Sequence, residues 1–573
     1  MTVVGGGIAG LTAALRLVER GFDVEVFEKG PLMGGNLSGV KHGGAYYDVY
    51  PHMFAEWFHN FWKLTEDIGL EKHKHFERRR DCGFLAPGDF PHYRVCTDIG
   101  AFRTGLKNLS SGVISLPEMF LANYTILDAI ARGDADKEFL ENQTLNDFIV
   151  NRPYATRGVT HFFDSVVRNV WSIDSYLSSA LAYQRFAKYQ FREPSPLCWV
   201  LKGNSYENFV VPLLKALNSR ANMHINTEVT GVTVGDGRVT RISYKHLKKG
   251  AEVDRDVDGL IIASSPASLG DLIFTPASKD RNNADAQSIV SLLPNLANVR
   301  RLGSDPLPVL YVTFKRKLAQ IPSYYVALLN SKYSLTFVQI EELSGPKKTV
   351  LAVAASDFDA LPVRLKEALA NAIDDKGIMP TLSSQVKREL KDAAHPILKE
   401  FQRYVPFKLE EDIDWDKTFF QPNLDQKLFL NEVGSQRWTT EVSYPEINNL
   451  YFAGNSCANS IMIATVESAV YSGLQAAGAV VQRHRHLDAV SIIDPEAYPT
   501  PLLFAWKIML APYAALAKIW VEADTLLKDT MGMRPRPGAL PGARAVSEIG
   551  RSLETAIIEW WKAADSFWRR SER

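Results

Sequence analysis

Three glycines near the start of the chain have the spacing of a phosphate-binding turn. Gly5, Gly7 and Gly10 follow an apolar stretch and precede an apolar helical pattern. In such a turn the first glycine permits the tight bend, the second lets backbone N–H groups approach a pyrophosphate, and the third lets the helix pack closely on the strand. The helix N-terminus adds the positive end of its dipole. The spacing predicts a dinucleotide site, against the alternative of a glycine-rich turn with only a packing role.

An acidic residue stands where the second strand of this unit should end. Glu28 directly follows the β-like run 24–27 and lies 18 residues after Gly10. A carboxylate at that place can accept hydrogen bonds from both hydroxyls of an adenosine ribose. Because an acid also disfavours a 2′-phosphate, the unit predicts a dinucleotide that lacks this group.

A second glycine turn lies more than 400 residues downstream. Residues 449–456 have the pattern of a short buried strand that ends in a Gly-Asn turn, and residues 465–477 that of a helix whose N-terminal half can point at a phosphate or a flavin ring. Together with the double glycine at 34–35, this segment resembles the flavin-containing amine oxidase and phytoene desaturase superfamily. The resemblance implies that both ends of the chain grip one FAD.

Within this superfamily the chain is most similar to the carotenoid and phytoene desaturase branch. The similarity lies in residues 46–54, 60–70 and 307–318. Asn36 stands where the family usually has Arg or Lys, and Asn455 where it has an acid. An amide can hydrogen-bond but cannot neutralise charge, so both contacts to the cofactor are expected to be amide contacts.

The resemblance also implies the residues of the site. It puts Asp48 and His52 near the reactive side of the flavin, as a base or as a carboxylate that stabilises positive charge; a purely structural hydrogen-bonding role is the alternative. The implied cofactor-binding residues are Gly5, Gly7, Ile8, Ala9, Gly10, Glu28, Lys29, Gly34, Gly35, Asn36, the backbone of Val229, Gly454, Asn455, Glu467 and Ser468.

We expect an α/β fold with a discontinuous, Rossmann-like FAD-binding domain of the glutathione-reductase type, an inserted α+β substrate domain and a C-terminal helical extension. A hairpin is predicted at Gly235-Asp236-Gly237, and the run 258–266 has the pattern of a buried central strand. Helices are predicted at 140–150 and 384–401, and strands at 308–315 and 335–355. The predicted domains are 1–70, 200–265 and 440–485 for FAD, 71–199 and 266–439 for the substrate, and 486–573 for the extension.

The composition limits the partners and the compartment. Lys plus Arg equals Asp plus Glu at 65 each, so no global field attracts nucleic acid. The four cysteines lack paired or zinc spacing, and the histidines show no set of partners at metal spacing, so we assign no metal site. A strand that begins at residue 2 leaves no room for a signal peptide. We therefore expect a cytoplasmic enzyme.

Aromatic residues are dense after the first cofactor segment. Such a wall suits an apolar, extended substrate, but three- and four-residue spacing is also that of an ordinary helical core, which is the interpretation we favour. The residues concerned are Phe54, Trp57, Phe58, Phe61 and Trp62.

The extension carries two apolar segments. Lys507, Lys518 and the helix breaker Pro512 make residues 502–520 a poor transmembrane span. A final amphipathic helix is predicted at 546–568. Its polar face has at least as many acids as bases, which favours packing or a homo-oligomer. Peripheral contact with the inner face of a membrane is the alternative.

The resemblance implies hydride removal from a C–H bond to flavin N5. We expect desaturation or dehydrogenation of a hydrophobic substrate, an isoprenoid or a fatty acyl chain, with oxygen or a quinone as electron acceptor. Three alternatives remain open. One is an amine or amino-acid oxidase, which would need an aromatic cage and usually a lysine-bound water. The others are an FAD-dependent double-bond isomerase and a non-catalytic flavoprotein scaffold.

Overall fold

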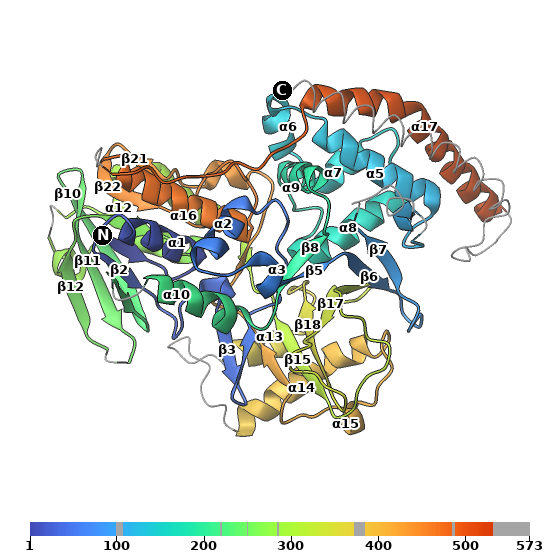
Figure 1. The fold of residues 1–573 in the computed structure, drawn as a ribbon, viewed down its shortest axis with the longest axis horizontal. Coiled ribbons are helices and arrows are strands. Elements are labelled where there is room, and N and C mark those ends of the chain that lie inside the picture. Colours follow the sequence, from blue (N-terminus) through green and yellow to red (C-terminus); the bar gives the residue numbers. More distant parts are fainter. Residues whose placement is uncertain are drawn as a thin grey trace.

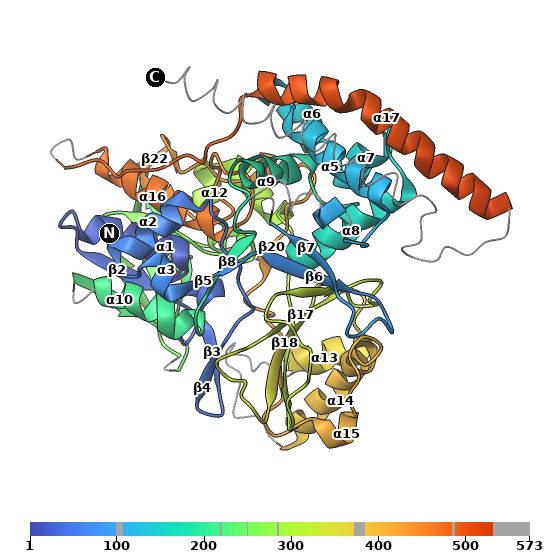
Figure 2. The same cartoon turned by 45° about the vertical axis from the view of Figure 1, so that its right-hand side comes forward.

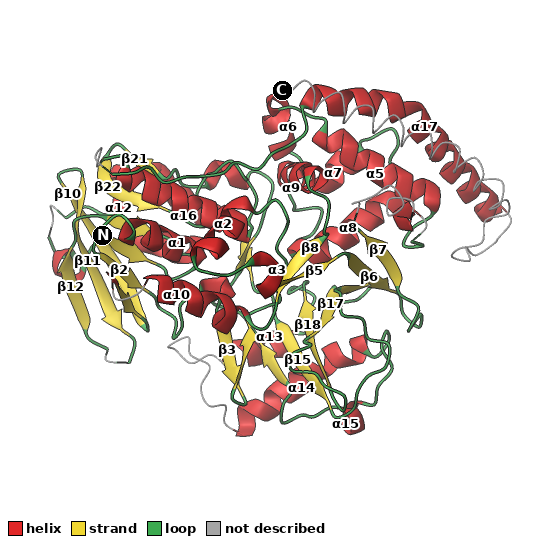
Figure 3. Cartoon of the chain, in the orientation of Figure 1, coloured by secondary structure: helices red, strands yellow, loops and turns green. Residues whose placement is uncertain are grey.

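The computed structural model describes residues 1–98, 107–109, 111–217, 220–248, 250–283, 286–371, 384–483 and 487–530. The final helix predicted at 546–568 lies outside these residues. Two large sheets and a group of helices make up the described part of the chain (Figure 1; Figure 3 colours strands and helices separately).

The first sheet has six strands in the order β21-β22-β13-β1-β2-β9. Its strands from β22 to β9 are parallel, and β21 pairs antiparallel at one edge. All six come from the segments 1–70, 200–265 and 440–485, so a discontinuous Rossmann-like sheet is present, as predicted. The strands are β1 (Thr2–Val4), β2 (Val24–Phe27), β9 (Ala221–His224), β13 (Leu260–Ile262), β21 (Ser443–Tyr444) and β22 (Ile447–Phe452).

Helices cover one face of this sheet and a smaller sheet covers the other (Figure 1). The predicted hairpin is confirmed, with Asp236 and Gly237 at positive φ. Strand β9 ends at His224 and β10 begins at Thr227, because the chain leaves the first sheet there and enters the second. The elements are α1 (Ile8–Val18), α2 (His59–Asp67) and α16 (Val466–Val481) on one face, and β10 (Thr227–Gly235), β11 (Arg238–His246), β12 (Glu252–Asp256) and α11 (Pro266–Leu272) on the other.

A seven-stranded sheet forms the base of the second half of the molecule, in the order β19-β15-β18-β17-β16-β6-β7. One of its faces packs on α13 and α14, and the other turns toward residues 40–50. The predicted strands at 308–315 and 335–355 and the helix at 384–401 are confirmed. The elements are β6 (Asp81–Leu85), β7 (Arg94–Thr97), β15 (Val309–Phe314), β16 (Val326–Leu328), β17 (Leu335–Gln339), β18 (Thr349–Ala355), β19 (Phe419–Gln421), α13 (Val363–Asn371) and α14 (Ser384–Phe401).

The helical group lies beside both sheets, at the upper right of Figure 1. The single helix predicted at 140–150 is wrong in one respect: the chain breaks at 142–144, where the Thr144 side chain caps a new helix by accepting from Asp147 N–H at 2.9 Å. The group comprises α5 (Leu116–Ile130), α6 (Lys137–Glu141), α7 (Leu145–Val150), α8 (Arg157–Trp171), α9 (Ala180–Arg192) and α17 (Thr500–Thr530).

Shorter elements connect these parts. Strand β5 pairs with β8 where the chain passes between the halves, and α11, from residue 266 onward, packs with β1 and β13. The shorter elements are β3 (Gly39–His42), β4 (Ala45–Asp48), β5 (Phe76–Arg79), β8 (Cys198–Leu201), β14 (Ser304–Asp305), β20 (Leu428–Phe429), α3 (Lys72–His75), α10 (Val211–Leu217), α12 (Ile289–Leu292) and α15 (Leu409–Asp412).

Candidate functional site

The glycine turn connects β1 to α1 and leaves helical N–H groups available. A Cβ on Gly5 would lie 2.3 Å from Ala263 O, and a Cβ on Gly10 would lie 2.1 Å from Gly5 O. Leu11 N–H makes the first helical hydrogen bond, to Gly7 O at 2.9 Å. The N–H groups of Ile8, Ala9 and Gly10 therefore precede the helical ladder, in the position where a pyrophosphate can accept from them.

Glu28 lies beside this turn at the end of β2. Its Oε2 accepts from Gly6 N–H at 2.8 Å, and its Oε1 accepts from Gly30 N–H at 2.7 Å. Burial raises the pKa of the carboxyl group, although both hydrogen bonds oppose the shift. Each carboxylate oxygen can accept more than one hydrogen bond, so the group can still receive ribose hydroxyls.

The other residues expected near the adenosine half lie at the same edge. Lys29 Nζ is 3.4 Å from Glu228 Oε1. Val229 is opposite Tyr244 in the β10–β11 ladder, next to a β-bulge. Lys29, which follows Glu28, thus lies next to the start of β10.

The double glycine packs directly on the glycine turn. Gly34 has a φ of 116°, and its N–H donates to Gly6 O at 2.7 Å. A Cβ on Gly35 would lie 3.0 Å from Gly7 Cα. The Asn36 amide is turned toward Lys427 O, at 3.4 Å. Close backbone approach, and not only conformational freedom, therefore explains these glycines.

The turn after β22 contains buried polar atoms that the described residues leave unsatisfied. Gly454 has a φ of 108°, and its N–H donates to Ser472 Oγ at 2.8 Å. Asn455 Oδ1 and Ser264 Oγ are buried and have no hydrogen-bond partner in the described structure. Ser264 follows β13, the strand between β1 and β22. These two unsatisfied atoms, at the carboxyl ends of the neighbouring strands β22 and β13, fit a polar ligand at this edge.

A small cavity opens beside Asn455. Ser468 lies in its wall, and Ser468 Oγ accepts from the Asn459 amide at 3.0 Å. Cys457 also lies there, 2% exposed, and burial raises the pKa of its thiol to about 12, in keeping with a small buried filler. Among the residues that line the cavity are Gln436, Asn455, Cys457, Asn459, Met462 and Ser468.

Glu467 is placed differently from the other expected ligands. Its Oε1 accepts from the N–H of Asn60 at 3.0 Å and from the Asn60 amide at 2.7 Å, and its Oε2 accepts from Phe61 N–H at 2.9 Å. The side chain is fully buried, and burial raises the pKa of the carboxyl group. Both oxygens therefore serve the first turn of α2, and Glu467 joins α16 to α2 rather than facing the glycine turns.

Asp48 and His52 lie between the two halves of the molecule. Asp48 Oδ1 accepts from Ser205 N–H at 2.6 Å, at the start of the helical segment that leads into α10. Burial raises the pKa of Asp48 to about 7. Burial lowers the pKa of His52 to about 4, and His52 Nδ1 has no hydrogen-bond partner in the described structure. The Asp48 side chain thus holds the start of that helical segment, and the imidazole of His52 is neutral at pH 7.

Three side chains of the second half hold the backbone of this segment. Tyr311 OH donates to Asp48 O at 2.7 Å, and Tyr325 OH donates to His52 O at 3.3 Å. The Asn423 amide donates to Val49 O at 2.7 Å. The sequence did not reveal these three residues, because they lie more than 250 positions away from the carbonyls that they bind.

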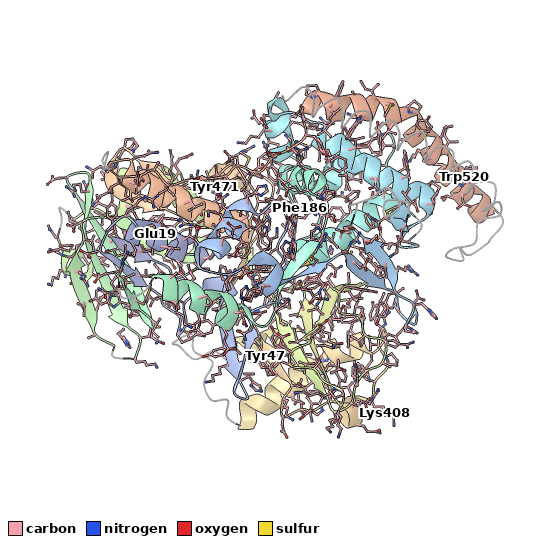
Figure 4. All side chains as sticks on the ribbon, viewed as in Figure 1. Glu19, Tyr47, Phe186, Lys408, Tyr471 and Trp520 are labelled. Atoms are coloured by element: carbon pink, nitrogen blue, oxygen red, sulfur yellow. The ribbon has the colours of Figure 1, made fainter. Side chains whose placement is uncertain are left out.

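The face of the large sheet that turns toward this segment is apolar. Strand alternation puts its inward side chains at every second position, and the rings of Tyr47 and Tyr311 are 5.0 Å apart where the hairpin β3–β4 meets the sheet (Figure 4 labels Tyr47). The inward positions of β15, β17 and β18 are Val309, Tyr311, Thr313, Thr336, Val338, Val350, Ala352 and Ala354.

The aromatic run after residue 53 is core, as favoured above. All five side chains are at most 7% exposed and pack with α1 and α16, so they do not line a substrate path. The rings of Phe54 and Phe61 are stacked at 4.5 Å. The predicted helix is shorter than the spacing indicated: α2 begins at His59, so Phe54, Trp57 and Phe58 lie before it.

Comparison with known proteins places these features in a family. The family model for flavin containing amine oxidoreductase matches residues 8–481. Among solved structures, putrescine oxidase bound to putrescine aligns with a TM-score of 0.54 and 14% identity, over 84% of this chain and 98% of that one. At this identity the likeness concerns the fold.

Two curated relatives are carotenoid enzymes. The 1-hydroxycarotenoid 3,4-desaturase of Flavobacterium sp. is 35% identical over 102 residues, which are 16% of this chain and 21% of the relative. The zeta-carotene desaturase of Solanum lycopersicum is 28% identical over 215 residues, 36% of this chain and 37% of the relative. The matches thus span between about a fifth and two fifths of these relatives. The family match nevertheless covers most of the chain. The chain therefore belongs to the flavin-containing amine oxidoreductases and has FAD as its cofactor.

Proposed function

We propose that this protein dehydrogenates or desaturates a hydrophobic substrate, an isoprenoid or a fatty acyl chain, with FAD. The observation that carries the proposal is the inward face of the large sheet, where the eight alternating positions hold only apolar and hydroxyl-bearing side chains. This face packs on Val49 and Tyr50, and its uncharged side chains favour a substrate that has no charge to be paired, because a buried charge without a partner is costly.

The residues of the chain would bind and orient the reactants. The N–H groups at the start of α1 would hold the pyrophosphate, and Asn455 Oδ1 would accept a hydrogen bond from a polar group of the cofactor. Bound FAD supplies the acceptor for a hydride from a C–H bond. His52 is neutral at pH 7, and Tyr311, Tyr325 and Asn423 fix the backbone of its segment.

An amine oxidase is the second candidate, since the fold is shared with putrescine oxidase. Enzymes of that type usually use a lysine-bound water at the flavin. The inward positions of β15, β17 and β18 include no lysine. This observation favours the desaturase over the amine oxidase.

We also propose an electron acceptor, a compartment and a place where the substrate is met. Electrons pass on to oxygen or a quinone, and the enzyme works in the cytoplasm, with its hydrophobic substrate met at the inner face of a membrane. A homo-oligomer through the C-terminal extension is the competing arrangement.

The products of turnover test the proposal. The FAD-loaded protein is incubated with isoprenoid and fatty acyl substrates in detergent micelles, or with amines, and oxygen or a quinone is present. The masses of the products are measured by mass spectrometry. Loss of two hydrogens from either class supports the proposal. An unchanged product mass would indicate isomerisation, and peroxide formed only with amines would indicate the amine oxidase. If no class of substrate is converted, the result would indicate a non-catalytic flavoprotein scaffold.

A further inference from the structure

Helix α17 runs along the outside of the helical group as one continuous helix. Figures 1 and 2 show it at the outer edge of the molecule, beside α5. The helix continues through Pro512, an exposed residue that has no N–H to donate to Ile508 O, so the expected break is absent although one hydrogen bond of the ladder is lost. The inner side is anchored in the core shared with α5 by Leu503, Trp506 and Ala514, which are at most 7% exposed.

Lys507 and Lys518 of α17 point toward the protein. Lys507 Nζ is 2.6 Å from Oδ1 of Asp128, a residue of α5 that is 2% exposed. Lys518 Nζ donates to Ala155 O and lies 2.9 Å from Glu522 Oε1. These are the two charged residues between positions 500 and 521. The usual arrangement of a surface helix, with charges outward and apolar residues inward, is thus altered over this stretch.

The outer face that results has no charge over twenty residues, about 30 Å of helix. Mean hydropathy reaches 1.5 over an 18-residue window within Thr500–Leu526, yet only 17% of that window is buried. Ile508, Leu516 and Ile519 are 59%, 64% and 61% exposed, and the aromatic Tyr513 and Trp520 are 48% and 52% exposed (Figure 4 labels Trp520). The outer face consists of Pro501, Phe504, Ala505, Ile508, Met509, Ala511, Pro512, Tyr513, Ala515, Leu516, Ile519 and Trp520.

The size and shape of this outer face favour lipid over protein. A stable protein interface uses roughly 20–30 residues on each side, and the outer face of α17 offers 12. The helix is long and apolar enough to cross a membrane, but contacts of its inner side with α5 and Ala155 extend along it, and α17 would have to break them to span a bilayer. An apolar strip with exposed Tyr and Trp suits the boundary between headgroups and acyl chains.

We infer that α17 binds a lipid bilayer by lying flat in one leaflet, with its outer face among the acyl chains and the Lys507 and Lys518 pairs kept on the protein side. This inference extends the proposed function by naming the surface at which the enzyme meets a membrane. Binding needs no substrate and no turnover, so it can fail while the proposed reaction stands, and the reverse.

Vesicle flotation tests the inference with the full FAD-loaded chain. We expect the protein to float with phosphatidylcholine vesicles, and raised salt should not release it, because the outer face carries no charge. The double variant L516E/I519E should lower the partition coefficient at least about tenfold, since two carboxylates would have to enter the acyl region. The matched control V253E/V363E alters two valines, 45% and 68% exposed, on distant elements and should float like the original protein.

Three results would overturn the inference. They are a protein that does not float, equal flotation of both double variants, and a dimer in light scattering that L516E/I519E dissociates although no vesicles are bound. The last result would assign the outer face to a second copy of the chain. Thermal melting and FAD content should match among all variants, because the altered side chains are exposed, and turnover of a micellar substrate should be unchanged.

Discussion

At the scale of single residues, the site is marked by polar atoms that the protein does not satisfy. Asn455 Oδ1 and His52 Nδ1 are buried without a partner in the described structure. A buried acceptor without a donor costs free energy in the apoprotein. At Asn455, bound FAD can offset that cost by donating a hydrogen bond to Oδ1. At His52, burial keeps the imidazole neutral.

The variant Asn455→Leu tests the first of these atoms. Leucine has a similar size but cannot accept a hydrogen bond, so FAD binding should weaken roughly tenfold, about 1.4 kcal/mol, while the apoprotein should become slightly more stable. FAD fluorescence titration and melting of the apoprotein measure the two effects. The control Asn448→Leu alters an exposed residue of β22 and should change neither. Unchanged affinity in Asn455→Leu would show that this oxygen does not contact FAD.

The pKa of His52 predicts a pH dependence of stability. Burial lowers the pKa from 6.5 to about 4, so the unfolded state binds more protons between these pH values and stability falls as the pH falls through this window. His52→Gln should remove this component, so that between pH 4 and 6.5 the urea midpoint of the variant rises less with pH, or falls more, than that of the original protein.

Asp48 supplies a control of opposite sign. Burial raises its pKa from 3.8 to about 7, so its contribution to stability is present at low pH and is lost as the pH rises toward 7. Asp48→Asn should therefore change the slope in the opposite direction, so that the urea midpoint rises more steeply with pH than in the original protein. A wild-type slope that persists in His52→Gln would contradict the placement of His52.

At the scale of elements, close backbone contacts between α1 and α16 hold the two ends of the chain together. A Cβ on Gly473 would lie 2.4 Å from Ala9 O. The same helix contains Gly478, whose Cβ would have Val490 Cβ as its nearest neighbour, at 3.8 Å. One glycine of α16 is thus required by packing and the other is not.

We predict opposite outcomes for alanine at these two positions. Gly473→Ala should lower the free energy of unfolding by about 2–3 kcal/mol and weaken FAD binding, because α16 must move away from the α1 N-terminus. Gly478→Ala should be neutral or stabilising by about 0.5–1 kcal/mol through helix propensity. Urea unfolding of both variants measures the difference. Equal effects would contradict the close contact of the two helices.

Local patterns predicted most of the elements, and they failed where tertiary contacts decide. The strand before Gly5 and the hairpin at Asp236 follow from period and turn chemistry alone. The start of α2 does not, since it depends on Glu467, a carboxylate more than 400 residues away that accepts from Asn60 and Phe61. Glu467 looked like a cofactor ligand because its partner helix cannot be found from sequence spacing.

At the scale of the whole molecule, the large sheet and the cofactor half meet at Val49. The Asn423 amide donates at 2.7 Å to Val49 O and at 2.7 Å to Leu307 O, and the residue is 2% exposed. Asn423 thereby joins the loop at the site to the strand region that forms its wall. Any change there should affect both stability and the reaction.

Asn423→Asp should destabilise the protein by about 3 kcal/mol and slow turnover, because two buried carbonyls lose their donor and face a carboxylate. Both residues tolerate the φ of 54° at this position. The control Asn330→Asp makes the same exchange at a φ of 59°, where the side-chain oxygen is bonded to His161 Nε2 and is retained. Urea unfolding and single-turnover rates report the two effects. A mild effect equal to that of the control would contradict the joint at Val49.

The glycine motifs predicted the FAD cofactor. The residues of the second half that contact residues 48–52 could not be predicted from the sequence. Asn423, Tyr311 and Tyr325 come from the second half and act on backbone carbonyls, which leave no trace in the spacing of residues. Ser264 could have been found, because it directly follows a predicted central strand and parallel strands place ligands at their carboxyl ends.

The most direct test of the central claim is anaerobic flavin absorbance during titration of the FAD-loaded protein with isoprenoids, fatty acyl chains and amines in turn. The account predicts bleaching of the visible flavin band by an isoprenoid or a fatty acyl substrate and none by amines. Bleaching by amines alone, or an unchanged band with every class while FAD stays bound, would contradict it.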